Sequence, residues 1–389
     1  MKNYIAEILK GNRSCWDKEI SAKVLSFLKL SQNFFHQFKF SLFDNRYLIY
    51  ICLTYYMSTF IVGLWLNVKI TGDLNFYYML FYGYLFAFFF LIWSLFTIIH
   101  LIKNFKQGFN GIPVVWSLLR QRFLCSETIS RFIIIFSIIP LFICSYSSFK
   151  QAIPLVHGFS SDALLFHFDK ILHFNVSPWE ILHPIIGYPA ITRFIDFCYV
   201  AWGSIFAYSL LYMACHCDRR LRLGFFISLA CCWIVIGNIL AMIFSSAGPC
   251  YFSQATGSAI NPYMPLFDYL RSIPDLQAIN IQDLLWKAFQ TGHFMPLGGI
   301  SAMPSMHVSV AVLLALLYRK INKWLGWTMI GFAIIIQVGS VHLGWHYAAD
   351  GYISATLTIL IWKITERNLA QKPIVEGSVQ VEETIRIGF

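Results

Sequence analysis

Long apolar stretches recur along this chain more often than the core of a water-soluble protein can absorb. Stretches of about 20 mostly apolar residues are long enough for a helix to cross a hydrocarbon layer of roughly 30 Å. Hydrophobic residues make up 58% of the chain and charged residues only 12%, which excludes an ordinary soluble domain. The sequence therefore predicts an all-α polytopic membrane bundle of about eight transmembrane helices, which begin near Tyr47, Phe76, Ser130, Phe194, Leu223, Met303, Trp324 and Tyr347.

The composition changes along the chain and predicts four parts. Residues 1–46 form a basic arm in which apolar side chains such as Val24 and Phe27 recur at helical spacing, as in an amphipathic helix on the cytoplasmic membrane surface. Residues 47–129 hold two accessory transmembrane helices and a loop, residues 130–362 a six-helix catalytic core, and residues 363–389 a cytoplasmic tail. Two segments, 161–184 and 266–289, are too polar to span and are expected to be interfacial or re-entrant helices that roof the outer end.

The basic residues predict the orientation in the membrane, because lysine and arginine gather on cytoplasmic flanks. Every second loop is basic, as the flanks at 103–131, 219–222, 319–323 and 363–386 show, whereas the loop from 247 to 302 is poor in cations. Both termini are therefore expected in the cytoplasm, with the alternate loops on the periplasmic or lumenal face. This asymmetry accounts for the net charge of +10, so we predict no nucleic-acid partner.

The first polar motif at a predicted outer membrane boundary is the run Gly298–His307, GGISAMPSMH. A glycine turn leads into a helix, with Pro304 expected in the first helical turn, where a missing amide hydrogen costs nothing. The free amides and the positive end of the helix dipole favour a bound phosphate. Ser305 is expected to add a hydroxyl donor, and His307 to reach the ester oxygen of the substrate.

The second motif sets His342, His346 and Asp350 at intervals of four residues, which places them on one face if the backbone stays helical. Asp350 is then expected to accept a hydrogen bond from one nitrogen of His346, leaving the other nitrogen as a nucleophile or base. One histidine at a membrane boundary is more often an ordinary interface residue. Two such motifs on consecutive spans and on the same side indicate phosphoryl transfer, since ionisable groups at membrane depth are costly and usually functional.

These residues resemble a known family. P-S-M-H and H-Y-A-A-D are similar to the second and third signature motifs of the type 2 phosphatidic acid phosphatase/haloperoxidase superfamily, P-S-G-H and S-R-x-x-x-x-x-H-x-x-x-D. The resemblance covers about residues 130–362. It implies that His346 is the nucleophile, Asp350 its orienting partner and His307 the general acid.

The chain lacks the arginine residues that the family pattern places in its first and third motifs. The first motif, K-x-x-x-x-x-x-R-P, is judged missing because no Arg-Pro pair occurs, and Ser340 takes the place of the arginine of the third motif. The remaining triad resembles the inositol phosphorylceramide synthase branch, as does the glycine-proline turn at Gly248. The candidates for substitute phosphate-binding cations are Lys170, Arg193, Arg271 and His342, and His342 is favoured because it shares the face of His346.

The sequence thus predicts an integral-membrane phosphotransferase that acts on phospholipid or sphingolipid headgroups through a phosphohistidine, with membrane lipids as donor and acceptor. Its predicted substrate-binding residues are Pro304, Ser305, His342, Gly248 and Lys170. No cofactor and no metal is expected, since the outer segments lack a cluster of carboxylates and histidines. A lipid phosphate phosphatase that uses water is the first alternative. A transporter or scaffold is the second, disfavoured because the polar mid-span residues Asn238 and Gln337 are uncharged.

Overall fold

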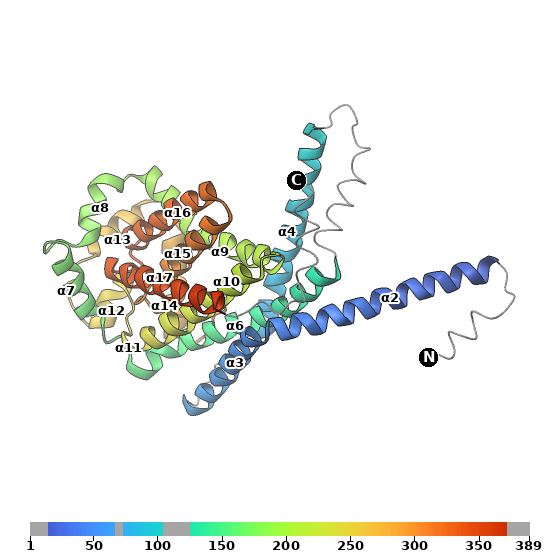
Figure 1. The fold of residues 1–389 in the computed structure, drawn as a ribbon. Coiled ribbons are helices and arrows are strands. Elements are labelled where there is room, and N and C mark those ends of the chain that lie inside the picture. The colour runs from blue at the N-terminus through green and yellow to red at the C-terminus, as the bar shows by residue number, and fades with distance from the viewer. Residues whose placement is uncertain (1–14, 67–72, 104–124, 372–389) are drawn as a thin grey trace. The chain divides into compact units, whose positions relative to one another are not determined.

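The computed structural model describes residues 15–66, 73–103 and 125–371, and every regular element in these ranges is a helix (Figure 1). The predicted all-α class is therefore confirmed for the described part of the chain. Parts of the basic arm, of the 103–131 flank and of the tail lie outside the described residues. The helices are α2 (Cys15–Asp44), α3 (Arg46–Leu66), α4 (Leu74–Lys103), α6 (Ser126–His157), α7 (Asp162–Leu172), α8 (Pro178–Ile186), α9 (Pro189–Ala214), α10 (Arg219–Cys231), η2 (Cys232–Leu240), α11 (Ala241–Ile243), η3 (Pro249–Tyr251), α12 (Phe252–Thr256), α13 (Met264–Ser272), α14 (Gln277–Gln290), α15 (Met306–Ile321), α16 (Lys323–His342) and α17 (Ala348–Ala370).

The chain divides into two compact units, and the division falls inside three of the helices. The first unit consists of residues 1–50 and 86–139, and the second of residues 51–85 and 140–389. Within the first unit, α2 is a single helix of 30 residues, as the spacing of its apolar residues predicts. The second unit contains every residue that the sequence analysis places in the site.

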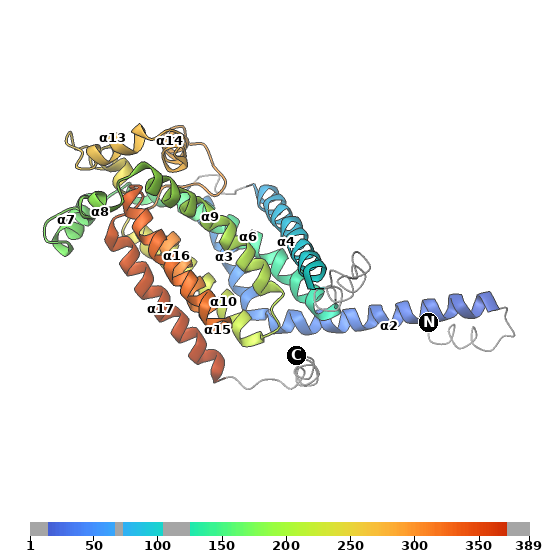
Figure 2. The same cartoon turned by 90° about the horizontal axis from the view of Figure 1, so that it is seen from above.

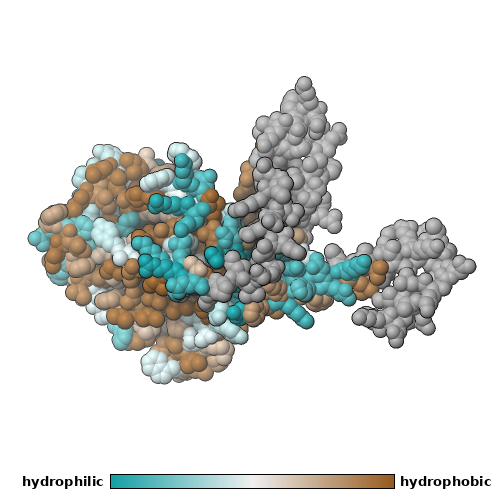
Figure 3. All heavy atoms as spheres, viewed as in Figure 1, coloured by the Kyte–Doolittle hydropathy of each residue, from teal (hydrophilic) through white to brown (hydrophobic). Residues whose placement is uncertain are grey.

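Six of the described helices are long and apolar enough to cross a membrane. They are Arg46–Leu66, Leu74–Leu95, Ser126–His157, Pro189–Ala214, Arg219–Ile243 and Lys323–His342. The other two predicted spans correspond to α15, which has 16 residues, and α17, which has 23, and both pack against α16. The face of the second unit seen in Figure 3 is largely apolar, as a bundle surrounded by lipid requires.

Four shorter helices occupy the two segments that the sequence predicted to be non-spanning. Helices α7 and α8 fall within residues 161–184 and just beyond, and α13 and α14 account for the segment around 266–289. Figure 2 shows α13 and α14 lying across one end of the second unit. That they are helices is confirmed, and their place at the membrane interface stays a prediction.

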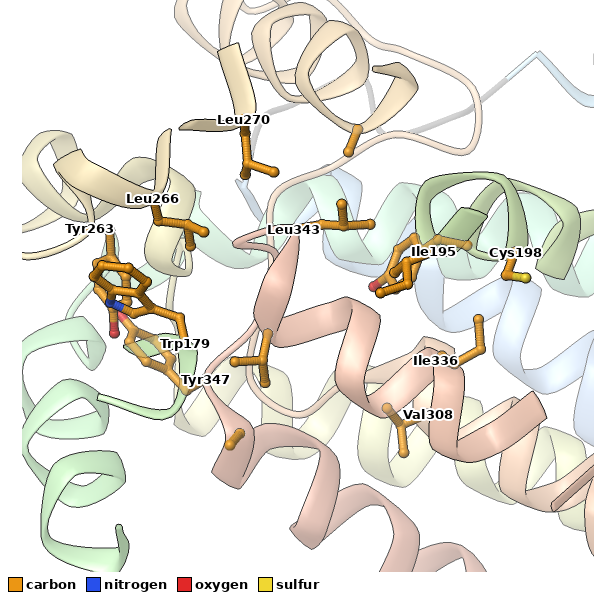
Figure 4. Packing of buried hydrophobic residues seen from close by; sticks show 14 of the residues in the cluster. Trp179, Ile195, Cys198, Tyr263, Leu266, Leu270, Val308, Ile336, Leu343 and Tyr347 are labelled. Carbon is orange, nitrogen blue, oxygen red and sulfur yellow. The ribbon is translucent and has the colours of Figure 1, made fainter. Parts of the chain in front are cut away.

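A buried apolar cluster fixes the roof of the second unit to the loop between α16 and α17. Leu266 and Leu270 of α13 are fully buried and pack in one cluster with Leu343 and Tyr347 of that loop (Figure 4). Burial of each such side chain stabilises the fold by about 1.5–3 kcal/mol. The segment that carries the second motif is thereby held under α13.

Candidate active site

The second motif lies on a loop and not on one continuous helix. Helix α16 ends at His342 and α17 begins at Ala348, so the expectation of a single helical face through Asp350 is wrong. The chain turns at Gly344, whose φ is +72°, and a Cβ atom there would approach the Phe267 ring to 2.4 Å. A glycine is needed at this position both for its backbone angle and for the close packing of α13.

The ring of His346 is held by a backbone carbonyl. Its Nδ1 lies 2.8 Å from the carbonyl oxygen of Ala302 and 3.4 Å from Oδ2 of Asp350. A carbonyl oxygen only accepts, so Nδ1 carries the hydrogen and Nε2 keeps its lone pair. The expected hydrogen bond to Asp350 is thus replaced by one to Ala302, with the carboxylate close beside it. This hydrogen bond fixes the imidazole in the tautomer whose Nε2 keeps its lone pair.

Burial keeps His346 neutral. Its side chain is 7% exposed. Burial, followed by the positive charge of Lys150, lowers the pKa of His346 to about 3, and the hydrogen bond to Ala302 opposes this shift. The nucleophilic nitrogen is therefore unprotonated at neutral pH.

Asp350 joins the two motifs to each other. Its Oδ2 accepts the backbone N–H of Tyr347 at 3.1 Å, and its backbone carbonyl accepts the N–H of Ser305 at 3.3 Å. Its Oδ1 is buried and has no hydrogen-bond partner among the described residues. The side chain of Asp350 therefore lies beside the ring of His346 and at the same time caps the start of α17.

The first motif forms the start of α15. Ser305 is the N-cap, and its side-chain oxygen accepts the N–H of Val308 at 3.5 Å. Helix α15 begins at Met306, so Pro304 precedes the cap. The expectation that Pro304 lies in the first helical turn is therefore wrong. Both Pro304 and Ser305 are buried, next to the backbone of Asp350.

His307 is positioned by two aromatic side chains of α9. Its ring stacks on Tyr199 at a centroid distance of 4.5 Å and contacts Trp202 at 4.4 Å. The indole Nε1–H of Trp202 donates to the His307 carbonyl at 3.0 Å. The rings of His307 and His346 lie 6.3 Å apart. The fold therefore brings the three predicted catalytic residues, His307, His346 and Asp350, to one place.

Two aspartates of α7 hold the loops around this place, and the sequence analysis missed both. Asp162 accepts the N–H groups of Ala247 and Gly248, each at 2.8 Å, and the hydroxyl of Tyr347 at 2.9 Å. Asp169 accepts the N–H groups of Ala348 and Ala349 at 2.9 Å, at the start of α17. Burial raises the pKa of both carboxyls, and these hydrogen bonds oppose the rise.

Gly248 contributes close packing beside His346. Its φ is +91°, and a Cβ atom would come within 2.6 Å of the carbonyl oxygen of Trp345 and 2.9 Å of the Cβ of Ala302. Its N–H is already bonded to Asp162. Gly248 thus lies at the site as predicted, where it allows the turn to approach the loop of His346.

The predicted cations have partners of their own. His342 Nε2 forms a hydrogen bond with the hydroxyl of Thr192 at 2.9 Å, and the ammonium group of Lys170 lies over the ring of Phe166 at 5.5 Å. Arg271 forms an exposed ion pair with Asp283, and Arg193 is exposed. Lys150 of α6, which the sequence analysis did not consider, contributes a positive charge that helps to lower the pKa of His346.

Fold and site together define a polytopic helical membrane protein with two histidines and an aspartate gathered in a buried site where neighbouring helices end. The family model of the PAP2 superfamily matches residues 163–364, more than half of the chain, and the chain belongs to this superfamily. Members are phosphatases, which supports an enzymatic activity on lipid phosphates. The chain as a whole matches no curated protein and no solved structure. The described residues contain no group of three or more His, Cys, Asp or Glu side chains that would hold a metal ion.

The spacing from Lys150 to His157-Gly158 matches the spacing of the first family motif. Lys150 is followed by six residues and then by His157-Gly158, so it occupies the lysine position of K-x-x-x-x-x-x-R-P with histidine and glycine in place of Arg-Pro. His157 is exposed, whereas the charge of Lys150 contributes to the lowered pKa of His346.

Proposed function

We propose that this protein is a membrane-embedded lipid phosphotransferase that works through a phosphohistidine on His346. The observation that carries the proposal is the fixed tautomer of His346, whose Nε2 keeps its lone pair beside His307 and the charge of Lys150. A neutral imidazole nitrogen is a competent phosphoryl acceptor, and a nearby second histidine is a suitable acid and base.

In the first half-reaction Nε2 of His346 attacks the phosphorus of a lipid phosphate ester. The bond between phosphorus and the leaving oxygen breaks, and His307 in its protonated form gives a proton to the leaving alkoxide, which departs as an alcohol. Lys150 stabilises the negative charge on the phosphoryl oxygens. Asp350, 3.4 Å from Nδ1, stabilises the positive charge that the ring of His346 acquires.

In the second half-reaction the acceptor hydroxyl attacks the phosphohistidine. His307, now neutral, removes the hydroxyl proton, the bond between Nε2 and phosphorus breaks, and the site returns to its starting state. When the acceptor is a lipid alcohol the product is a new lipid phosphodiester. When it is water the product is a phosphate monoester or free phosphate.

Two features support a lipid acceptor over water. The nucleophile is buried under α13, and a site closed to bulk water favours transfer over hydrolysis. The second feature is the resemblance of the histidine and aspartate motifs to the inositol phosphorylceramide synthase branch, which implies a phospholipid donor and a sphingoid or similar alcohol as acceptor. Hydrolysis of lipid phosphates is the second candidate, favoured by the phosphatases of the superfamily.

A panel of labelled phospholipids, incubated with detergent-purified protein with and without alcohol acceptors and with excess chelator, tests the proposal. We expect a labelled diester that forms only when acceptor is present and that persists in chelator. His346→Ala and His307→Ala should each lower turnover by several orders of magnitude, because members of such a site act as a unit.

Three outcomes would change the assignment. Release of labelled phosphate irrespective of acceptor would make the protein a phosphatase. Near-normal turnover in either histidine variant would remove that residue from the mechanism. Loss of activity in chelator, restored by magnesium or zinc, would contradict the metal-free reaction.

A further inference from the structure

The span that leads from Arg219 to Ile243 contains an unusual helical segment. Residues Cys232–Leu240 form η2, a π-helix, within an otherwise α-helical span. Such wide turns are rare and are frequent at functional sites. The one polar amide of this segment, Asn238, is 5% exposed.

The amide of Asn238 is only half satisfied. Its Oδ1 accepts the hydroxyl of Tyr55 of α3, while its Nδ2 is buried without a hydrogen-bond partner among the described residues. An unpaired N–H group in a hydrocarbon environment is costly because no water is there to bond it. The hydrogen bond between the two helices therefore satisfies the side-chain oxygen of Asn238, whereas its two N–H donors have no acceptor among the described residues.

Asn238 lines a hollow of about 420 Å³ between α3, α6 and the η2–α11 segment. Its walls are mainly apolar, with Phe149, Ile234 and Met242 among them. The hydroxyl of Ser58, also in the wall, already donates to the carbonyl of Tyr55. The amide of Asn238 is thus the unpaired polar group found among the buried groups of this hollow.

Asn238 lies near one end of its span and close to the first motif. It lies five residues before Ile243, where the span ends, which is about 7 Å of helix. The preceding residue, Gly237, packs so closely on Met306 that a Cβ atom would be 3.0 Å from its sulfur, and Met306 adjoins His307. The hollow and the catalytic pair therefore lie on two sides of the same helical segment.

We propose that this hollow binds a membrane lipid whose ester carbonyl accepts a hydrogen bond from Nδ2 of Asn238. The apolar side chains of the wall, which come from α6 and from the η2–α11 segment, suit an acyl chain. The depth, a short distance below the end of the span, is where the ester carbonyls of a phospholipid lie when its headgroup is at the surface. This site is separate from the catalytic one and does not depend on the reaction that is catalysed there.

The test compares a diacyl phosphatidylcholine with its dialkyl ether analogue, which has the same chains and no carbonyl. Retention of each lipid by the purified protein is measured by native mass spectrometry. We expect wild type to retain the ester lipid about tenfold more strongly, because binding of the ether leaves the amide unpaired. The preference should vanish in the double variant Tyr55→Phe/Asn238→Leu, which removes both partners of the interhelical bond together and so spares the fold.

Two further variants keep the proposal falsifiable. Ser58→Ala, in the same wall, should retain the preference, since that hydroxyl is bonded to its own helix. Met242→Trp fills the hollow and should weaken the retention of both lipids without touching the amide. Equal retention of ester and ether by wild type, an unchanged preference in the double variant, or undiminished binding to Met242→Trp would each overturn the proposal.

Discussion

Lys150 is the residue whose proposed role differs most from the sequence prediction. Its positive charge lowers the pKa of His346, and the proposed mechanism assigns to it the phosphate-binding role predicted for His342 and Lys170. Its substitution by methionine, which keeps the volume of the buried chain, should lower turnover by about 10² to 10³, as loss of one charge-stabilising group does elsewhere. Steady-state assays of Lys150→Met and Lys170→Met at equal expression provide the measurement. A larger loss in the Lys170 variant would assign the phosphate to the other lysine.

The neutral state of His346 has a consequence for stability. Its pKa is about 3 in the folded protein against an ordinary 6.5, so below pH 6.5 the unfolded chain takes up a proton that the folded protein refuses. Stability should therefore fall as the pH drops from 6.5, by about 2 kcal/mol at pH 5 from this residue. His346→Gln lacks this contribution.

Thermal unfolding in detergent at pH 7 and pH 5 measures the effect. The melting temperature should decrease more on acidification for wild type than for His346→Gln. An equal loss in both proteins would mean that His346 titrates normally and that its environment is wetter than its burial indicates.

Residue identities in the site were largely predictable, and their bonding was not. His307, His346 and Asp350 were found because polar groups stand out against apolar spans. The partner of His346 is the carbonyl of Ala302, a backbone atom that carries no side-chain signal. Lys150 has no such signal, because histidine and glycine stand where the Arg-Pro pair of the first motif would mark it.

Among the elements, α7 links the two halves of the site. Its inward face carries Asp162 and Asp169, whereas Leu164, Phe168 and Ile171 on its other face are exposed. The sequence predicted an interfacial helix here from its mixed composition, and the helix is there. The sequence did not predict that Asp162 and Asp169 bind these loops (the α7 clamp below), because hydrogen bonds to loops some 80 and 180 residues away leave no local pattern.

Asp169→Asn should reveal whether this clamp positions the catalytic loop. An amide retains one acceptor but loses the charge that caps α17, so we expect about 1 kcal/mol less stability. A small displacement of His346 should lower kcat by about 10- to 100-fold. KM should change little, because Asp169 is bonded to backbone amides and not to the substrate.

The matched control is Asp268→Asn, an exposed aspartate of α13. It should behave as wild type in both kcat and melting temperature. If Asp169→Asn raised KM and left kcat unchanged, α7 would belong to the substrate-binding surface instead of the positioning frame.

For the whole molecule, the apolar stretches predicted the helices well, since all eight correspond to described helices. The side of the membrane on which the site lies stays a prediction. It follows from the alternation of basic loops, and the exposed Cys217 lies in one of them, two residues before Arg219.

Labelling in intact cells with a membrane-impermeant maleimide tests this orientation. In a variant that retains only Cys217, we expect no labelling until the cells are permeabilised. A variant with Ser258→Cys as its sole cysteine should be labelled at once, since Ser258 is exposed in the loop predicted to lie outside. The reverse result would invert the topology and place the catalytic site toward the cytoplasm.

The cover that α13 and α14 form over the catalytic loop has a kinetic consequence. Gln282 of α14 donates to the carbonyl of Leu343 at 2.9 Å, and Phe267 of α13 lies against Gly344. A headgroup would then reach His346 sideways, from the leaflet, and not from the aqueous phase above. The velocity should accordingly follow the mole fraction of lipid in a mixed micelle and stay constant when micelles of fixed composition are made more numerous at saturating bulk lipid. The enzyme would respond to a two-dimensional concentration.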